Sequence, residues 1–207
     1  MSNLEYLTRE IESITKKLNE KYKMKEEIQL LSKEAQRLCG EAVSLTHRKM
    51  INEALEKIKS AEKIFEKVWK NLQTNLDLIR NTLTAFQEYV EARALIQIVT
   101  ENKIPLISEL KVPEQSYALG LADLIGELRR RTIDLLREDA ITDAEKTLEL
   151  MEKIYVLLQQ LEYPKSLVPG LRGKLDAMRR LIEDTRRLVV YSIISIKLRR
   201  ALEKASK

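Results

Sequence analysis

The sequence of 207 residues has little of what builds disulfide-rich, zinc-binding or membrane-spanning proteins. Its one cysteine, Cys39, excludes an internal disulfide framework, and with its one histidine, His47, it is too little for a Cys/His zinc site within one chain. The longest nearly apolar run, Leu188 to Ile196, is about half of a membrane-spanning helix. No signal-peptide pattern opens the chain. These absences predict a protein without membrane association and with a cytoplasmic location.

Glycine, proline and aromatic residues are also scarce, with 5 Gly, 4 Pro and 5% aromatic residues. Hydrophobic residues make up 44% of the chain and charged residues 33%, which is too apolar for a disordered chain. A chain of this length can bury a sizeable core. The composition therefore predicts an all-α protein with solvated helix faces.

Apolar residues recur at alternating steps of three and four, as they do in amphipathic helices. Gly40 is a candidate break in the first helix, and Thr142 opens the fifth with capping-box spacing to Glu145. Whether the second and third helices are continuous stays open at this stage. No internal repeat or linker divides the chain, so residues 1–207 are predicted to form a single domain, a bundle of about six to seven helices. The predicted helices cover about residues 4–38, 51–68, 72–100, 115–138, 142–161 and 171–205.

Two of these helices carry acidic pairs beside apolar residues. Glu88 and Glu91 are three apart and Asp123 and Glu127 are four apart, so each pair lies on one helix face. If the two helices pack together, up to four carboxylates converge. Hard oxygen ligands of this kind suit Mg²⁺ or Mn²⁺, which can orient a water and stabilise charge on a scissile phosphate. The alternative is a set of ordinary solvated acids, which are common at these spacings.

A glycine interrupts the second acidic helix near this pair. A glycine in a helix interior costs about 1 kcal/mol relative to alanine. Gly120 lies on the acidic side of the apolar stripe. It therefore predicts a close approach by a neighbouring helix or by substrate.

The two acidic segments, residues 86–92 and 117–128, resemble the translin family and, within it, most closely the branch of translin-associated factor X. The last predicted helix is similar in pattern to the family's final helix. The resemblance implies a seven-helix bundle, assembly into a hollow octamer, and binding of RNA or single-stranded DNA. It also implies an endoribonuclease site that depends on Mg²⁺ or Mn²⁺, with both metal-binding and catalytic roles on Glu88, Glu91, Asp123 and Glu127. The segment between the acidic motifs is shorter than in larger relatives, which favours a homo-oligomer of one kind of chain.

Basic residues exceed acidic ones by 37 to 32, which gives a net charge of +5 and favours a polyanionic partner. Arg130 projects toward the Asp123 side of its helix, where positive charge can hold a phosphate chain beside an acidic site. Solvated or salt-bridged side chains are the alternative for each basic residue. His47, alone of its kind, is interpreted as a loop residue. The predicted RNA-binding residues are Arg48, Lys49, Arg129, Arg130 and Arg137.

The predicted function is that of an RNA-binding, metal-dependent endoribonuclease subunit. Two alternatives stay open: a translin-like nucleic-acid binder that does not cut, and a helical scaffold that does neither. The last helix adds a structural expectation, because it is apolar over more than one stripe between Val189 and Ile196. Part of that surface is expected at a subunit contact or in the deep core.

Overall fold

The computed structural model describes residues 3–161 and 167–205. These residues form helices joined by turns, with no strand among them, as the composition predicts. No helix within these ranges is long and apolar enough to cross a membrane. The elements follow in the order α1 Asn3–His47, α2 Ile51–Leu72, the 3-10 helix η1 Leu76–Asn81, α3 Leu83–Glu101, α4 Ile107–Leu110, α5 Glu114–Arg137, α6 Ile141–Gln159 and α7 Leu171–Ala205.

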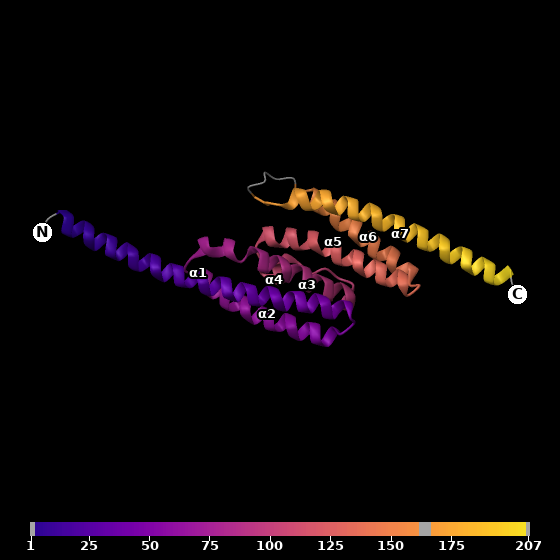
Figure 1. Ribbon diagram of the computed structural model, residues 1–207, viewed down its shortest axis with the longest axis horizontal. Helices are drawn as coiled ribbons and strands as arrows, with labels where there is room; N and C mark the ends of the chain where they lie inside the picture. The colour runs from indigo at the N-terminus through magenta and orange to yellow at the C-terminus, as the bar shows by residue number, and fades with distance from the viewer. Residues whose placement is uncertain (1–2, 162–166, 206–207) are drawn as a thin grey trace.

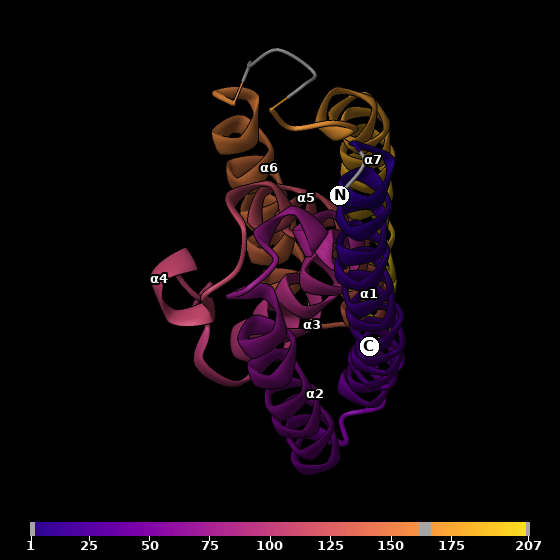
Figure 2. The same cartoon turned by 90° about the vertical axis from the view of Figure 1, so that its left-hand side faces the viewer.

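Helices α3 and α5 occupy the middle of the bundle (Figures 1 and 2). Helix α3 packs on α1, α2 and α5, and α5 packs in turn on α6 and α7. One hydrophobic cluster joins α1 and α2 to one face of α3, which includes Phe86 and Ile96. A second joins another part of α3, with Leu95 and Ile98, to α5, α6 and α7. Val43 and Leu121 pack against both clusters, so the two cores are continuous.

The central place of α3 follows from its sequence. Ala94, Leu95 and Ile96 are successive residues, so they point in different directions around the helix, and all three are fully buried. At its other end Phe86 stacks on Phe65 of α2, with ring centroids 4.6 Å apart. Because α3 is surrounded by other helices, its polar side chains are at least partly enclosed between them.

Several helix boundaries differ from the sequence prediction. Helix α1 passes through Gly40 without a break and ends at His47. The second and third helices are separate, with η1 between them. Helix α6 begins at Ile141 after Ala140, and no side-chain cap is formed, so the capping box predicted at Thr142 is wrong.

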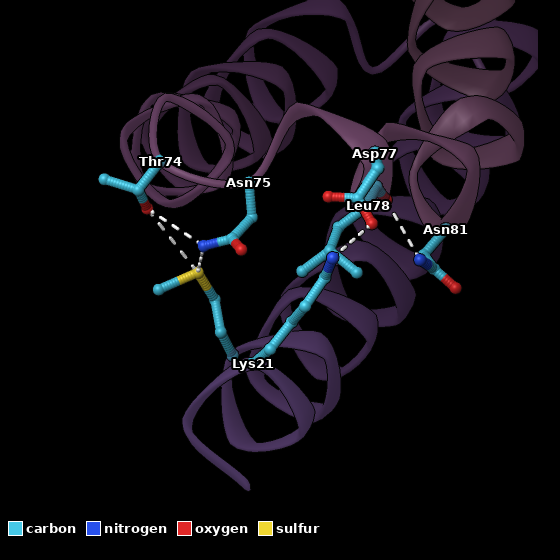
Figure 3. A network of polar contacts seen from close by, with 7 residues as sticks. Lys21, Thr74, Asn75, Asp77, Leu78 and Asn81 are labelled. Atoms are coloured by element: carbon cyan, nitrogen blue, oxygen red, sulfur yellow. Dashed lines mark hydrogen bonds and ion pairs between the residues drawn. The ribbon is translucent and has the colours of Figure 1, made fainter. Parts of the chain in front are cut away.

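The first part of α1 projects from the body, and residues 3–20 are all exposed (Figure 1). Figure 3 shows where the helix joins the body through polar contacts with the segment around η1. Lys21 Nζ lies 2.6 Å from the carboxylate of Asp77. Asn75 Nδ2 donates to the sulfur of Met24 at 3.0 Å. Ile28 is the first residue of α1 in the core.

Candidate functional site

The two acidic helices meet at a glycine. A Cβ atom on Gly120 of α5 would lie 2.6 Å from the carbonyl oxygen of Gln87 and 2.7 Å from Cβ of Val90, both on α3. Real Cβ atoms do not approach this closely, so only glycine lets the two backbones come together here. The predicted close approach is confirmed, and the neighbour is a helix. Asp123, one turn after Gly120, is thereby brought beside α3.

Four carboxylates converge at this crossing, and we call Glu88, Glu91, Asp123 and Glu127 the acidic cluster. All four residues are partly buried, and the side chains of Asp123 and Glu127 are 20% and 24% exposed. The charges of the other three all act on Glu91. The alternative of ordinary solvated acids is therefore wrong for this set.

Burial and like charge disfavour ionisation within the acidic cluster. Burial is the main cause that raises the pKa of Glu91 to about 8. The negative charges of Asp123, Glu127 and Glu88 add to this rise, and Lys174 opposes it. Burial also raises the pKa of Glu88, where a hydrogen bond from Gln36 opposes the shift. At neutral pH Glu91 therefore holds a proton in the folded protein, unless a cation joins the cluster.

Polar side chains of α1, α3 and α7 contact the carboxylates of the acidic cluster. Gln36 of α1 donates to Glu88 Oε1 at 3.2 Å. Lys174 of α7 forms an ion pair with Asp123, which also accepts a hydrogen bond from Gln87 of α3. The site is thus built by α1, α3, α5 and α7 together. Nothing in the sequence singled out Gln36, Gln87 or Lys174, because polar residues on amphipathic helices look like solvated ones until the helices are packed.

His47 is the fourth polar partner, and its interpretation as a loop residue is wrong. It is the last residue of α1, and its side chain is only 5% exposed. Its Nε2 atom lies 2.5 Å from Glu127 Oε2. The reason for the difference is that α1 continues past Gly40 and its end abuts α5. A single histidine beside a helix end carries no spacing signal that would have found this contact.

The acidic cluster fits a hard divalent cation by the chemistry of its donors, because carboxylate oxygens are the ligands that Mg²⁺ and Mn²⁺ prefer. A cation would also relieve the repulsion around Glu91. The present arrangement turns the carboxylates of Asp123 and Glu127 to protein donors. Within residues 3–161 and 167–205, no three His, Cys, Asp or Glu side chains are spaced to hold a metal ion. Binding of one cation by all four carboxylates therefore requires Asp123 to turn away from Lys174, or Glu127 to turn away from His47.

The predicted RNA-binding residues lie in the turn after α1 and in the part of α5 that follows Glu127. Arg48 and Lys49 form the turn after α1, and Lys49 pairs with Glu138 at 2.6 Å. Arg130 is exposed, whereas Arg129 is partly buried and its Nε atom has no hydrogen-bond partner. Arg137 lies 3.5 Å from Asp134. A role of these five residues in RNA binding stays a prediction.

A small pocket lies beside this turn and shares His47 with the site. It has a volume of about 90 Å³ and lies between the end of α1 and the last turns of α5. His47 and Lys49 line it from one side and Arg131 from the other. Asp134 and Glu138 line the pocket as well, so its basic and acidic residues are balanced.

Comparison with known proteins gives consistent matches over most of the chain. The model of the family described as the Translin family matches residues 3–194. The uncharacterized protein MJ0175 of Methanocaldococcus jannaschii is 34% identical over 196 residues, which cover 90% of this chain and 84% of the relative. The solved complex of AfC3PO with duplex RNA superposes with a TM-score of 0.83 at 30% identity, covering 90% of this chain and 97% of that chain. The structure of apo-NeC3PO gives 0.76 at 25% identity, covering 93% and 98%.

Proposed function

Because the chain belongs to the translin family, we propose that it is an RNA-binding, Mg²⁺-dependent endoribonuclease subunit of the type of translin-associated factor X. The observation that carries the proposal is the convergence of four carboxylates at the crossing of α3 and α5, with the pKa of Glu91 raised to about 8. A structural set of surface acids does not need such a costly arrangement. RNA as the substrate class is supported by the similar fold of AfC3PO, which was solved with duplex RNA.

In this proposal the acidic cluster holds the cation, and bound Mg²⁺ or Mn²⁺ supplies Lewis-acid stabilisation of charge on the scissile phosphate. Lys174 and His47 position the carboxylates of Asp123 and Glu127 and limit their repulsion in the absence of the cation. The pKa of Glu91 is raised to about 8 in the absence of the cation, so binding of the cation near neutral pH releases a proton from this carboxyl.

The basic residues hold the RNA strand beside the acidic cluster. Arg130 is the first candidate, because it is exposed and lies one helical turn after Glu127. Arg48, Lys49, Arg129 and Arg137 extend the positive track toward the end of the bundle. We further propose that the subunit works in a homo-oligomer, an octamer by resemblance to the family, and that it acts in the cytoplasm on RNA, with single-stranded DNA as a second ligand.

The test is incubation of the purified protein with end-labelled short RNAs, in Mg²⁺ and in EDTA. We expect Mg²⁺-dependent internal cleavage by the wild type, and its loss by at least about a hundredfold in Glu91→Gln and in Asp123→Asn, as when a principal electrostatic group is removed. The matched control is Glu101→Gln at the exposed end of the same helix. Full activity in either cluster variant would contradict the site.

A translin-like binder that does not cut is the second candidate. It is favoured by the internal neutralisation of the cluster, since Asp123 is paired with Lys174 and Glu127 contacts His47. It predicts salt-sensitive RNA binding in the same samples, with no product that depends on Mg²⁺. A scaffold would show neither binding nor cleavage.

A further inference from the structure

Lys174 brings a positive charge into the acidic cluster from a helix outside the crossing of α3 and α5. Its ammonium forms an ion pair with Asp123 of α5. Its charge also lowers the pKa of Glu91 of α3, against the rise that burial causes. The ammonium therefore lies within electrostatic reach of acids on both helices, as a cation shared by the cluster must.

The helix that carries Lys174 does not favour a lysine at this position. Lys174 is the fourth residue of α7, and the first turn of α7 contains no acidic residue. Positive charge near the amino end of a helix is disfavoured by the helix dipole. The contact that offsets this cost is the one with Asp123, which lies 51 positions earlier in the chain. The lysine therefore serves the acidic cluster rather than its own helix.

The ammonium and a divalent cation need the same oxygen atoms. Lys174 contacts Oδ1 of Asp123, and Gln87 donates to Oδ2 of the same carboxylate. An ammonium offers only hydrogen-bond donors, so it cannot itself be a ligand of the cation. Two positive charges at one carboxylate also repel each other. A cation that takes Oδ1 of Asp123 therefore competes with Lys174.

Of the two side chains that hold the carboxylates of α5, Lys174 is the one that is free to move. The side chain of His47 is only 5% exposed, at the end of the packed helix α1. The side chain of Lys174 is 31% exposed. Its flexible four-carbon stem carries a strongly hydrated ammonium, so it can turn into water once its ion pair is broken. Movement of His47 requires space inside the close-packed bundle.

We propose that Lys174 is a built-in counter-ion, which neutralises the acidic cluster in the absence of the divalent cation and turns into solvent when Mg²⁺ or Mn²⁺ binds. This role of Lys174 rests on the cation site proposed above and adds the residue that lowers its affinity. Neutralisation of Asp123 by Lys174 is then the resting state of a working cation site.

The first measurement is the affinity of the full chain for Mn²⁺ without RNA, from the electron paramagnetic resonance signal of free Mn²⁺. We expect Lys174→Gln to bind Mn²⁺ about tenfold more tightly than the wild type, because no ion pair has to be broken first. Lys174→Arg keeps the charge and should stay within about threefold of the wild type. The matched control, Arg172→Gln, removes the same charge from an exposed position of α7 and should change the affinity by less than about twofold.

The sign of the change distinguishes competition from support. A lysine that prepares Asp123 for the cation would make Lys174→Gln bind Mn²⁺ more weakly, and that result or an unchanged affinity would overturn the inference. Asp123→Asn tests the cation site separately, since loss of a ligand should weaken binding. Weaker binding by Asp123→Asn beside unchanged binding by Lys174→Gln would leave the proposed function standing alone. No binding of Mn²⁺ by the wild type or by Lys174→Gln at millimolar concentration would overturn both.

Lysine labelling follows the displacement in the wild type, without any substitution. An acetylating reagent modifies an amine more readily when it is exposed and released from an ion pair, since an ion pair favours the charged, unreactive form. Mass spectrometry of the peptides should show Lys174 labelled at least about threefold faster with saturating Mg²⁺ than with EDTA. Lys153 of α6, in an exposed pair with Glu149, should react equally in both. A labelling rate of Lys174 that does not rise under conditions where Mn²⁺ binds would overturn the inference.

Discussion

Glu91 is the residue at which burial and charge conflict most. Its pKa is raised from the ordinary value near 4.5 to about 8, so the folded state binds a proton that the unfolded state releases between these pH values. The free energy of unfolding should therefore fall as pH rises from about 4.5 to 8 and stay level above that. Below the pKa of the unfolded state Glu91 is protonated in both states, so the cost of ionising the buried carboxyl is absent.

Glu91→Gln, which imitates the protonated carboxyl, should remove this dependence. Without Mg²⁺ we expect the variant to be more stable than the wild type by roughly 1–3 kcal/mol at pH 9, after discounting for partial exposure, and equally stable near pH 4. Denaturant unfolding at the two pH values measures the difference. A variant that is less stable than the wild type at pH 9 would show that the carboxylate is stabilised by a partner.

Lys174 should matter more than an ordinary surface lysine because it reaches an acid that is itself partly buried. Lys174→Gln leaves Asp123 without its ion pair and removes the positive charge that opposes the raised pKa of Glu91. We expect a loss of roughly 1–2 kcal/mol at pH 8, below the 3–5 kcal/mol of fully buried pairs. The control, Lys153→Gln, breaks an exposed pair with Glu149 and should change stability by less than about 0.5 kcal/mol. If the two substitutions lower the unfolding temperature equally, Lys174 does not stabilise the acidic cluster.

At the scale of the element, two glycines in α5 give opposite expectations. Gly120→Ala would drive a Cβ atom into the backbone of α3, so we expect a loss of roughly 1–3 kcal/mol from overpacking. Gly126→Ala meets nothing within 4 Å and should stabilise the chain by roughly 0.5–1 kcal/mol through helix propensity. Denaturant midpoints of the two variants measure the contrast, and equal midpoints would contradict the tight crossing of α3 and α5.

The sequence predicted elements better than it predicted their ends or their contacts. The 3.6-residue period located the helices, and Gly120 pointed to the helix crossing, because both signals are local. The extension of α1 through Gly40 was missed, since a glycine in a long helix costs too little to end it when the helix is packed. The contacts of His47 and Lys174 join residues 80 and 51 positions apart, and no local pattern contains them.

At the scale of the molecule, the acidic cluster lies where the two hydrophobic cores meet. Helix α3 belongs to both cores, and its acidic face receives side chains from α1 on one side and from α5 and α7 on the other. The cluster therefore forms only when the whole chain is packed, and a substitution in either core can loosen it. This nonlocal origin explains why spacing grouped the four acids into two pairs and the resemblance singled them out, but neither pointed to the residues that hold them.

The projecting part of α1 separates the stability of one chain from that of the assembly. Residues 3–20 contribute nothing to the described core, so their deletion should leave the unfolding temperature unchanged within a few degrees at concentrations where both proteins are monomers. At higher concentration the full chain should melt at a rising temperature, because association into the proposed homo-oligomer stabilises the native state. Calorimetry at several concentrations measures both. A truncated chain that melts far below the full chain even when dilute would mean that residues 3–20 stabilise the monomer directly.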